Sequence, residues 1–205
     1  QFFGKRKMGF RVRAKNDQYE QTVKTSGQVN GGLHQRPEYN VKLDAPEPDL
    51  SKFPADIWGE SFDVRLVNDQ LEALFSTHFD RTTFLLTHAD YKMEVVFDVG
   101  EVKREQDSIP ICEIELELIA GDTIHLFTIA QAIIKHIPAR LSDTTKASRG
   151  YQLLHGNVLE VSRLPKFINL ADDETTEEAF CKTVQLALHH WQHHQQVYAQ
   201  TNRLK

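Results

Sequence analysis

One run of the chain carries a glutamate at every second position, and this spacing restricts how the run can fold. The run extends from Pro110 to Ile119, and its glutamates are Glu113, Glu115 and Glu117. Side chains of a β-strand alternate between two faces, so these carboxylates would all lie on one face of a sheet. The residues between them are apolar or cysteine and would lie on the other face. Because adjacent carboxylates repel one another, we expect a metal ion or a set of Arg and Lys side chains opposite them.

Other segments alternate in the same way and predict antiparallel strands. We expect strands over residues 8–15, 19–25, 35–43, 78–87 and 92–98, with a loop at 26–32. Gly100 is expected to turn the chain so that residues 101–104 pair back. Charged residues recur at alternate positions of these strands, namely Arg11, Arg13, Lys24, Arg36, Glu38, Arg81, Glu94 and Asp98.

Two arrangements explain such alternation. A sheet with one solvated face gives it in any single strand. Arg and Glu repeated in phase across several strands favour a closed barrel whose charged face points inward, and such an interior needs a charged ligand. A polyphosphate with a divalent metal fits both signs, because carboxylates bind Mg²⁺ or Mn²⁺ and Arg and Lys bind phosphate oxygens. In-line attack by water on such a ligand requires no Ser or Cys nucleophile, and the sequence has no Gly-rich phosphate loop.

Helical patterns occupy the remainder of the chain. We expect a short helix near 68–74, a helix that Asp122 caps and Pro138 stops, and a short helix over 145–154. A capping box at Thr175 and Glu178 starts a long helix that continues to the end of the chain. Residues 158–170 are interpreted as a strand or linker. Two His pairs at helical spacing, 189/193 and 190/194, are interpreted as a polar helix face rather than a zinc site.

Composition excludes some classes of protein. A net charge of −5 argues against a general nucleic-acid coat, and no apolar run approaches the ~18 residues that span a bilayer. The length of 205 residues fits one domain, or one domain and the start of another. Cys112 and Cys181 lie in a strand-like and a helix-like run, so we expect two buried free thiols and a cytoplasmic location.

An ordered set of short motifs resembles a known family. The stretches are 8–13, 22–24, 31–41, 74–77 with Arg81, 98–103, 111–118 and 146–151. Together they resemble the CYTH domain, which is the triphosphate tunnel fold, and specifically the bacterial CYTH–CHAD inorganic triphosphatases. The resemblance implies an α+β protein built on an antiparallel eight-stranded β-barrel or tunnel with flanking helices. The family's first strand, which carries an ExExK motif, is missing from this chain, so low or no activity is expected of the chain by itself.

The resemblance also implies domain boundaries. Residues 1–165 would form the tunnel domain without its first strand. Residues 166–205 would form a linker and a long helix that begins a CHAD-type helical domain in cis. A homo-oligomer is compatible with this arrangement.

Roles for individual residues follow from the same resemblance. The metal, Mg²⁺ or Mn²⁺, would be held by Glu113, Glu115, Glu117, Glu38 and Asp98, and which of the three glutamates dominate stays open. The phosphates would be held by Arg11, Arg13, Lys24, Arg36, Arg81 and Lys146. Arg149, one helical turn after Lys146, is either a further phosphate ligand or a surface residue. Lys146 and Arg81 are the candidate catalytic residues.

The implied function is metal-dependent hydrolysis of inorganic triphosphate to pyrophosphate and phosphate. The partner is thus triphosphate or another polyphosphate, with no nucleic-acid polymer and no membrane. Two alternatives stay open. One is another tunnel activity, such as thiamine triphosphate hydrolysis or the adenylate cyclase reaction, and the other is a polyphosphate- or nucleotide-binding module without turnover.

Overall fold

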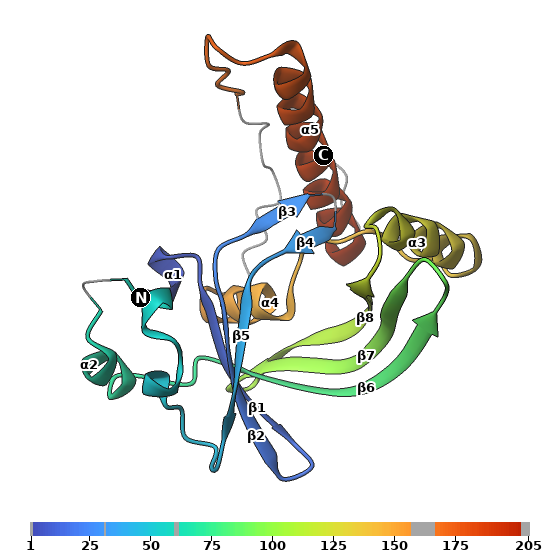
Figure 1. Cartoon of the computed structure of the whole chain (residues 1–205). Helices are drawn as coiled ribbons and strands as arrows, with labels where there is room; N and C mark the ends of the chain where they lie inside the picture. Colours follow the sequence, from blue (N-terminus) through green and yellow to red (C-terminus); the bar gives the residue numbers. More distant parts are fainter. Residues whose placement is uncertain (1, 31, 60–61, 157–166, 202–205) are drawn as a thin grey trace. The chain divides into compact units, whose positions relative to one another are not determined.

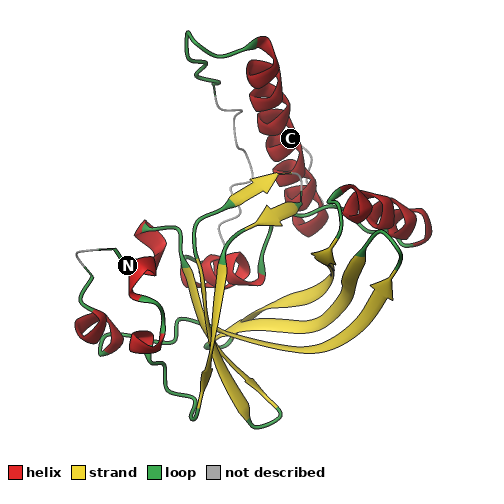
Figure 2. Cartoon of the chain, viewed as in Figure 1, coloured by secondary structure: helices red, strands yellow, loops and turns green. Residues whose placement is uncertain are grey.

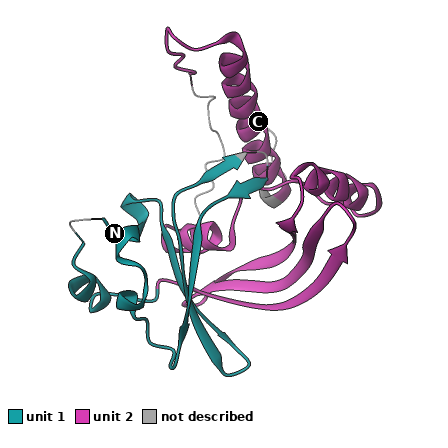
Figure 3. Ribbon diagram, viewed as in Figure 1, with its two compact units in different colours: residues 1–73 teal, residues 74–205 magenta. Residues whose placement is uncertain are grey.

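The computed structural model describes residues 2–30, 32–59, 62–156 and 167–201 (Figure 1). Helices and antiparallel strands are both present, which confirms the α+β class (Figure 2). The chain divides into two compact units, residues 1–73 and 74–205 (Figure 3). The predicted domain boundary at residue 165 lies in a segment outside the described residues.

The first unit is built on a three-stranded antiparallel sheet. Its strands, in sheet order, are β1 (Gly9–Lys15), β2 (Gln18–Lys24) and β5 (Glu38–Leu43). Asn16 and Asp17 join β1 to β2 and both have positive φ, at 49° and 60°. Such φ values suit a two-residue hairpin turn, and Asn and Asp tolerate them better than most residues.

A second hairpin in this unit corrects two sequence predictions. It consists of β3 (Gln28–Asn30) and β4 (Leu33–Gln35), so part of the predicted loop at 26–32 is strand. The strand predicted over 35–43 is also interrupted, because Arg36 and Pro37 separate β4 from β5. Proline has no N–H to donate to a sheet ladder, which explains the break.

The helices of the first unit are short and enclose its core. They are α1 (Phe2–Lys5), the 3₁₀ turns η1 (Leu50–Lys52) and η2 (Ala55–Ile57), and α2 (Val64–Asn68). Val23 and Leu50 are completely buried, and Phe53 and Trp58 are nearly so. The helix predicted near 68–74 lies earlier in the chain, as α2. Asp63 fixes its start, because the carboxylate accepts a hydrogen bond from the Leu66 N–H.

The second unit is built on three long strands joined as an antiparallel meander. They are β6 (Ser76–Thr87), β7 (Lys92–Arg104) and β8 (Asp107–Ala120), and Figure 1 shows them side by side as a curved sheet. The predicted turn at Gly100 is wrong, because β7 continues through it. Glycine is needed there for close packing: a Cβ at residue 100 would lie 2.0 Å from the His78 carbonyl oxygen and 2.7 Å from Phe79 Cβ.

In the described part of the second unit, three helices accompany the sheet. They are α3 (Ile124–His136), α4 (Lys146–Leu154) and α5 (Thr176–Thr201). Asp122 accepts a hydrogen bond from the Ile124 N–H at 2.8 Å, as expected for a residue at a helix start, although Thr123 occupies the cap position itself. The capping box of α5 is confirmed, since Thr175 and Glu178 exchange hydrogen bonds. Residues 158–166 lie outside the described part of the chain, and 167–170 are irregular.

The prediction for the two cysteines is only partly correct. Cys112 and Cys181 are free, as expected, but both are exposed rather than buried. Cys112 is exposed because its face of the sheet is largely uncovered, as the 58% exposed Phe84 on the same face shows.

The described strands form three separate sheets without a closed ring of pairing, so the eight-stranded tunnel stays a prediction. No helix in the described part of the chain is long and apolar enough to cross a bilayer.

Candidate metal and phosphate site

One face of the β6–β7–β8 sheet changes from apolar to charged along its strands. At one end, Val102, Ile111 and Leu153 are buried together, with Leu153 supplied by α4. Two residues beyond Ile111 on the same face, Arg81, Asp98 and Glu113 lie side by side on β6, β7 and β8. Because side chains alternate along each strand, one face carries both groups of residues. The apolar residues pack against α4, and the charged residues lie next to them on the same face.

Asp98 is the centre of the charged cluster. It is completely buried, and Arg81 donates to it from Nε to Oδ1 at 2.8 Å and from Nη2 to Oδ2 at 2.7 Å. The same guanidinium donates to Glu115 Oε2 at 2.9 Å. This two-point contact between a planar guanidinium and a carboxylate is the strong form of the ion pair. Together with the bond to Glu115, it links β6, β7 and β8 through one side chain.

Helix α4 delivers two further cations into the cluster. Lys146 is its first residue, after Thr145, which forms a capping box with Ser148. Lys146 Nζ lies 2.6 Å from Asp98 Oδ2, 2.5 Å from Glu113 Oε1 and 3.0 Å from Glu115 Oε1. Arg149 lies three residues later on the same side of the helix, and its Nη1 is 2.6 Å from Glu113 Oε2. The structure thus places Arg149 in the cluster rather than on a remote surface.

Opposite charges set the protonation of these groups. Burial raises the pKa of Asp98, but hydrogen bonds from Arg81 and Lys146 lower it more, so the pKa lies below its ordinary value. Glu113 behaves in the same way, with burial opposed by Lys146 and Arg149. Burial lowers the pKa of Lys146, and contact with the carboxylates raises it to above the ordinary lysine value. Asp98 and Glu113 are therefore anionic at neutral pH, and Lys146 is cationic.

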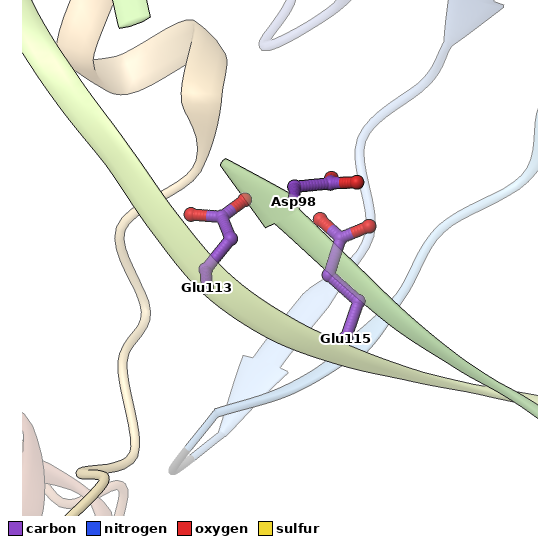
Figure 4. A group of neighbouring side chains, drawn as sticks. All are labelled: Asp98, Glu113 and Glu115. Atoms are coloured by element: carbon purple, nitrogen blue, oxygen red, sulfur yellow. The ribbon is translucent and has the colours of Figure 1, made fainter. Parts of the chain in front are cut away.

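Three carboxylates in this cluster are close enough to bind one ion. Asp98, Glu113 and Glu115 each offer an oxygen, and these oxygens lie within 4.8 Å of one another. Figure 4 shows their carboxyl groups converging from β7 and β8. The three carboxylates would have to move closer together to hold Mg²⁺, whose oxygen ligands lie at about 2.1 Å. An all-oxygen donor set suits Mg²⁺ or Mn²⁺.

Glu117 lies at the edge of this group. Its Oε1 is 3.8 Å from Arg81 Nη1, and its side chain is 54% exposed. It continues the face of Glu113 and Glu115, as the alternation predicts, but it is not among the three converging carboxylates. The geometry therefore favours Asp98, Glu113 and Glu115 as the ion-binding set, with Glu117 outside it.

The first unit has a smaller charged cluster of its own. Glu38 Oε2 is 2.7 Å from Lys24 Nζ, and Glu38 Oε1 is 3.5 Å from Arg11 Nη2. Strand register explains the contact, because Lys24 faces Glu38 across β2 and β5 and Arg11 lies on the adjacent strand β1. Burial raises the pKa of Glu38, but Lys24 and then Arg11 lower it to below the ordinary value.

The other predicted phosphate ligands of the first unit differ in position. Arg13 lies further along β1 on the face of Arg11, opposite Glu20. Arg36 is exposed and lies in the irregular link between β4 and β5, not on a strand face as the alternation predicted. It is held close to Gly27, where an added Cβ would lie 2.5 Å from Arg36 Cγ.

One residue of the site was not predicted from the sequence. Phe79 lies beneath both cations, with its ring centre 5.5 Å from Arg81 Cζ and 5.0 Å from Lys146 Nζ. An aromatic face attracts cations and separates the cluster from the apolar core. The sequence feature that could have identified Phe79 is its position two residues before Arg81, which places both on the same face of β6.

The histidines of α5 form no comparable site. His190 and His194 have ring centres 4.5 Å apart, and His189 Nδ1 lies 3.0 Å from Asp143 Oδ2. Among the described residues, only the Asp98 group brings three possible metal ligands together. The arrangement agrees with the polar helix face inferred from the sequence.

Comparison with known proteins supports the resemblance inferred from the sequence motifs. The family model of the CYTH domain matches residues 1–151. The chain is also 35% identical over 182 residues to the inorganic triphosphatase of Haemophilus influenzae. The alignment covers 88% of this chain and 51% of that protein, so the chain spans about half the length of the curated relative it matches.

Proposed function

The chain belongs to the CYTH domain family, and on this basis we propose that it provides the site for metal-dependent hydrolysis of inorganic triphosphate to pyrophosphate and phosphate. The observation that carries the proposal is the convergence of Asp98, Glu113 and Glu115 beside Arg81 and Lys146. Carboxylates for a divalent ion and cations for phosphate oxygens are thus present on one sheet face. The similarity to a protein named inorganic triphosphatase supports the choice of substrate.

The carboxylates have the metal-binding role in this proposal. Asp98, Glu113 and Glu115 would hold Mg²⁺ or Mn²⁺, with Glu117 and Glu38 as outer acidic groups. When bound, such an ion neutralises phosphoryl oxygens and helps to orient the attacking water. The chain itself supplies a buried carboxylate at the base of the site, and Asp98 is held there by two hydrogen bonds from Arg81.

The cations have the phosphate-binding role. Arg81 and Lys146 would stabilise the charge on the transferred phosphoryl group, which is the main requirement of phosphoryl transfer. Arg11, Arg13, Lys24, Arg36 and Arg149 would bind the remaining phosphate oxygens. Arg11, Arg13, Lys24 and Arg81 extend from strands and Arg149 from α4, so their backbones need not move when substrate binds.

The proposal includes the architecture that the family implies. We propose that residues 1–165 form the eight-stranded tunnel domain of this family, without its first strand. We also propose that residues 166–205 form a linker and the first helix of a CHAD-type domain. The antiparallel pairing within each unit and the exposed aromatic side chains of α5, such as Trp191 at 60%, support these two points.

The experiment measures phosphate release from inorganic triphosphate, ATP and thiamine triphosphate, each with Mg²⁺ or Mn²⁺. It uses this chain and a version extended upstream of Gln1. Release from triphosphate alone supports the proposal. Release from thiamine triphosphate, or pyrophosphate formation from ATP, would instead support another tunnel activity. Substrate binding without release from either protein would support a binding module and contradict hydrolysis.

A further inference from the structure

The ammonium group of Lys146 lies between the three carboxylates that are suited to a metal ion. Its Nζ is 2.6 Å from Asp98, 2.5 Å from Glu113 and 3.0 Å from Glu115. A divalent ion bound to the same three oxygens would lie within about 2 Å of each, and so would occupy nearly the same position. Two cations cannot share that volume. Lys146 and a metal ion therefore compete for one site.

The charge of the cluster is nearly balanced without a metal. Four carboxylates and three cations are in contact, which leaves one net negative charge. Arg81 and Arg149 each approach from one side, whereas Lys146 alone contacts all three converging carboxylates. Lys146 is therefore the cation whose removal would expose the complete metal-binding set.

The side chain of Lys146 can move more readily than the helix that carries it. Helix α4 is capped by Thr145 and packed closely, since a Cβ at Gly150 would lie 2.2 Å from the Phe75 ring. A lysine has a flexible four-carbon stem and no fixed donor plane. Displacement would thus occur by rotation of the side chain, with α4 kept in place.

We propose that Lys146 is a displaceable counter-ion, which occupies the metal position until a divalent ion replaces it. This inference rests on the proposed metal site but goes beyond it. Bound metal would release the ammonium group toward a phosphate oxygen. Metal binding and the availability of Lys146 for substrate would therefore be coupled, and Lys146 would reduce the excess negative charge of the cluster in the metal-free protein.

The first test is Mn²⁺ affinity, measured by electron paramagnetic resonance of free Mn²⁺ with the whole chain. Lys146→Met removes the competing charge at nearly constant length, so its affinity for Mn²⁺ should rise about 10-fold or more. Lys146→Arg keeps a charge and should stay near the original affinity. Lys103→Met removes an equal charge from an exposed pair with Glu101 and should change little.

Unchanged or weaker Mn²⁺ binding by Lys146→Met would overturn the inference, as would equal gains in Lys146→Met and Lys146→Arg. Absence of Mn²⁺ binding by both the original chain and Lys146→Met would also overturn it. Circular dichroism checks that each variant is folded.

A second test needs no substitution, and it decides the matter if Lys146→Met fails to fold. Acetylation of lysines in the original chain is followed by mass spectrometry with and without saturating Mg²⁺. Lys146 should react faster when Mg²⁺ is bound, while Lys103 serves as the internal reference. Equal or slower acetylation of Lys146 would overturn the inference. Neither test requires turnover, so a failure of triphosphate hydrolysis would contradict the proposed function and leave this result intact.

Discussion

Arg81 binds Asp98 through two parallel hydrogen bonds, from Nε to Oδ1 at 2.8 Å and from Nη2 to Oδ2 at 2.7 Å. The two residues face each other directly across β6 and β7. Asp98 is completely buried, while the Arg81 side chain is 27% exposed. The pair thus fixes a negative charge at the base of the site and a cation at its rim.

Removal of Arg81 should destabilise the fold as well as the site. Arg81→Met would leave buried Asp98 with Lys146 as its remaining cation. We expect a loss of about 2 kcal/mol in the free energy of unfolding, less than for a fully buried pair because Arg81 is partly exposed. Urea unfolding followed by circular dichroism measures the change. Arg104→Met, which removes an exposed pair with Glu105, is the control and should cost less than about 1 kcal/mol. Equal stability of both variants would contradict the structural role of Arg81.

Glu115 tests the metal assignment. Glu115→Gln keeps the shape of the side chain but removes one charged ligand, so triphosphate hydrolysis should fall about 100-fold at fixed Mg²⁺. Phosphate release by the version extended upstream of Gln1 measures the change. Glu101→Gln alters a partly exposed glutamate of β7 that pairs with Lys103, away from the cluster, and should retain activity. If Glu115→Gln turned over triphosphate at the original rate, Glu115 would not be a metal ligand.

Acid should weaken the fold because of the charged cluster. Asp98 and Glu113 have pKa values below their ordinary values in the folded state, so the unfolded chain binds protons more readily. Their contribution to stability is present above the unfolded pKa, near 4, and is lost as pH falls through the folded pKa. Thermal unfolding between pH 3 and 7 should show this loss, and it should be smaller in Asp98→Asn. A melting temperature that stays constant down to pH 3 would contradict the assignment.

The same linkage has the opposite sign for Lys146. Its pKa is raised in the folded state, so its contribution to stability is complete below the unfolded value, near 10.4. That contribution is lost only as pH rises through the still higher folded pKa. The cluster should therefore be most stabilising between about pH 5 and 10.

Gly100 should tolerate no side chain. In Gly100→Ala the new Cβ would meet the His78 carbonyl oxygen at 2.0 Å, which is backbone and cannot easily move. We expect destabilisation by about 2 kcal/mol or more, measured by urea unfolding. Gly9→Ala is the matched control, because Gly9 is also in a strand and has nothing within 4 Å of an added Cβ. Similar stability of the two variants would show that β6 and β7 are not this close.

Alternation along the strands predicted much of the site. It placed Glu113 and Glu115 on one face, and the structure confirms that Asp98 and Arg81 share it. Period-two alternation is a local property, so a single sequence carries it. The approach of Lys146 from α4 is not local, and only the resemblance to a family pointed to it.

The predictions that were wrong also have physical causes. Gly100 was interpreted as a turn because glycine is common in turns, whereas its role depends on Phe79 of the neighbouring strand. The exposure of Cys112 depends on what covers its face of the sheet, which strand alternation does not contain. Arg36 lost its predicted strand position because Pro37 follows it.

Asp98, Glu113 and Glu115 are proposed to bind one divalent ion in place of Lys146. The most direct measurement is a crystal structure of the chain with Mn²⁺, with the ion located by anomalous scattering. We predict a peak coordinated by all three carboxylates, with Lys146 Nζ moved out of contact with them. A peak elsewhere, or Lys146 still bound to all three carboxylates at saturating Mn²⁺, would contradict the account.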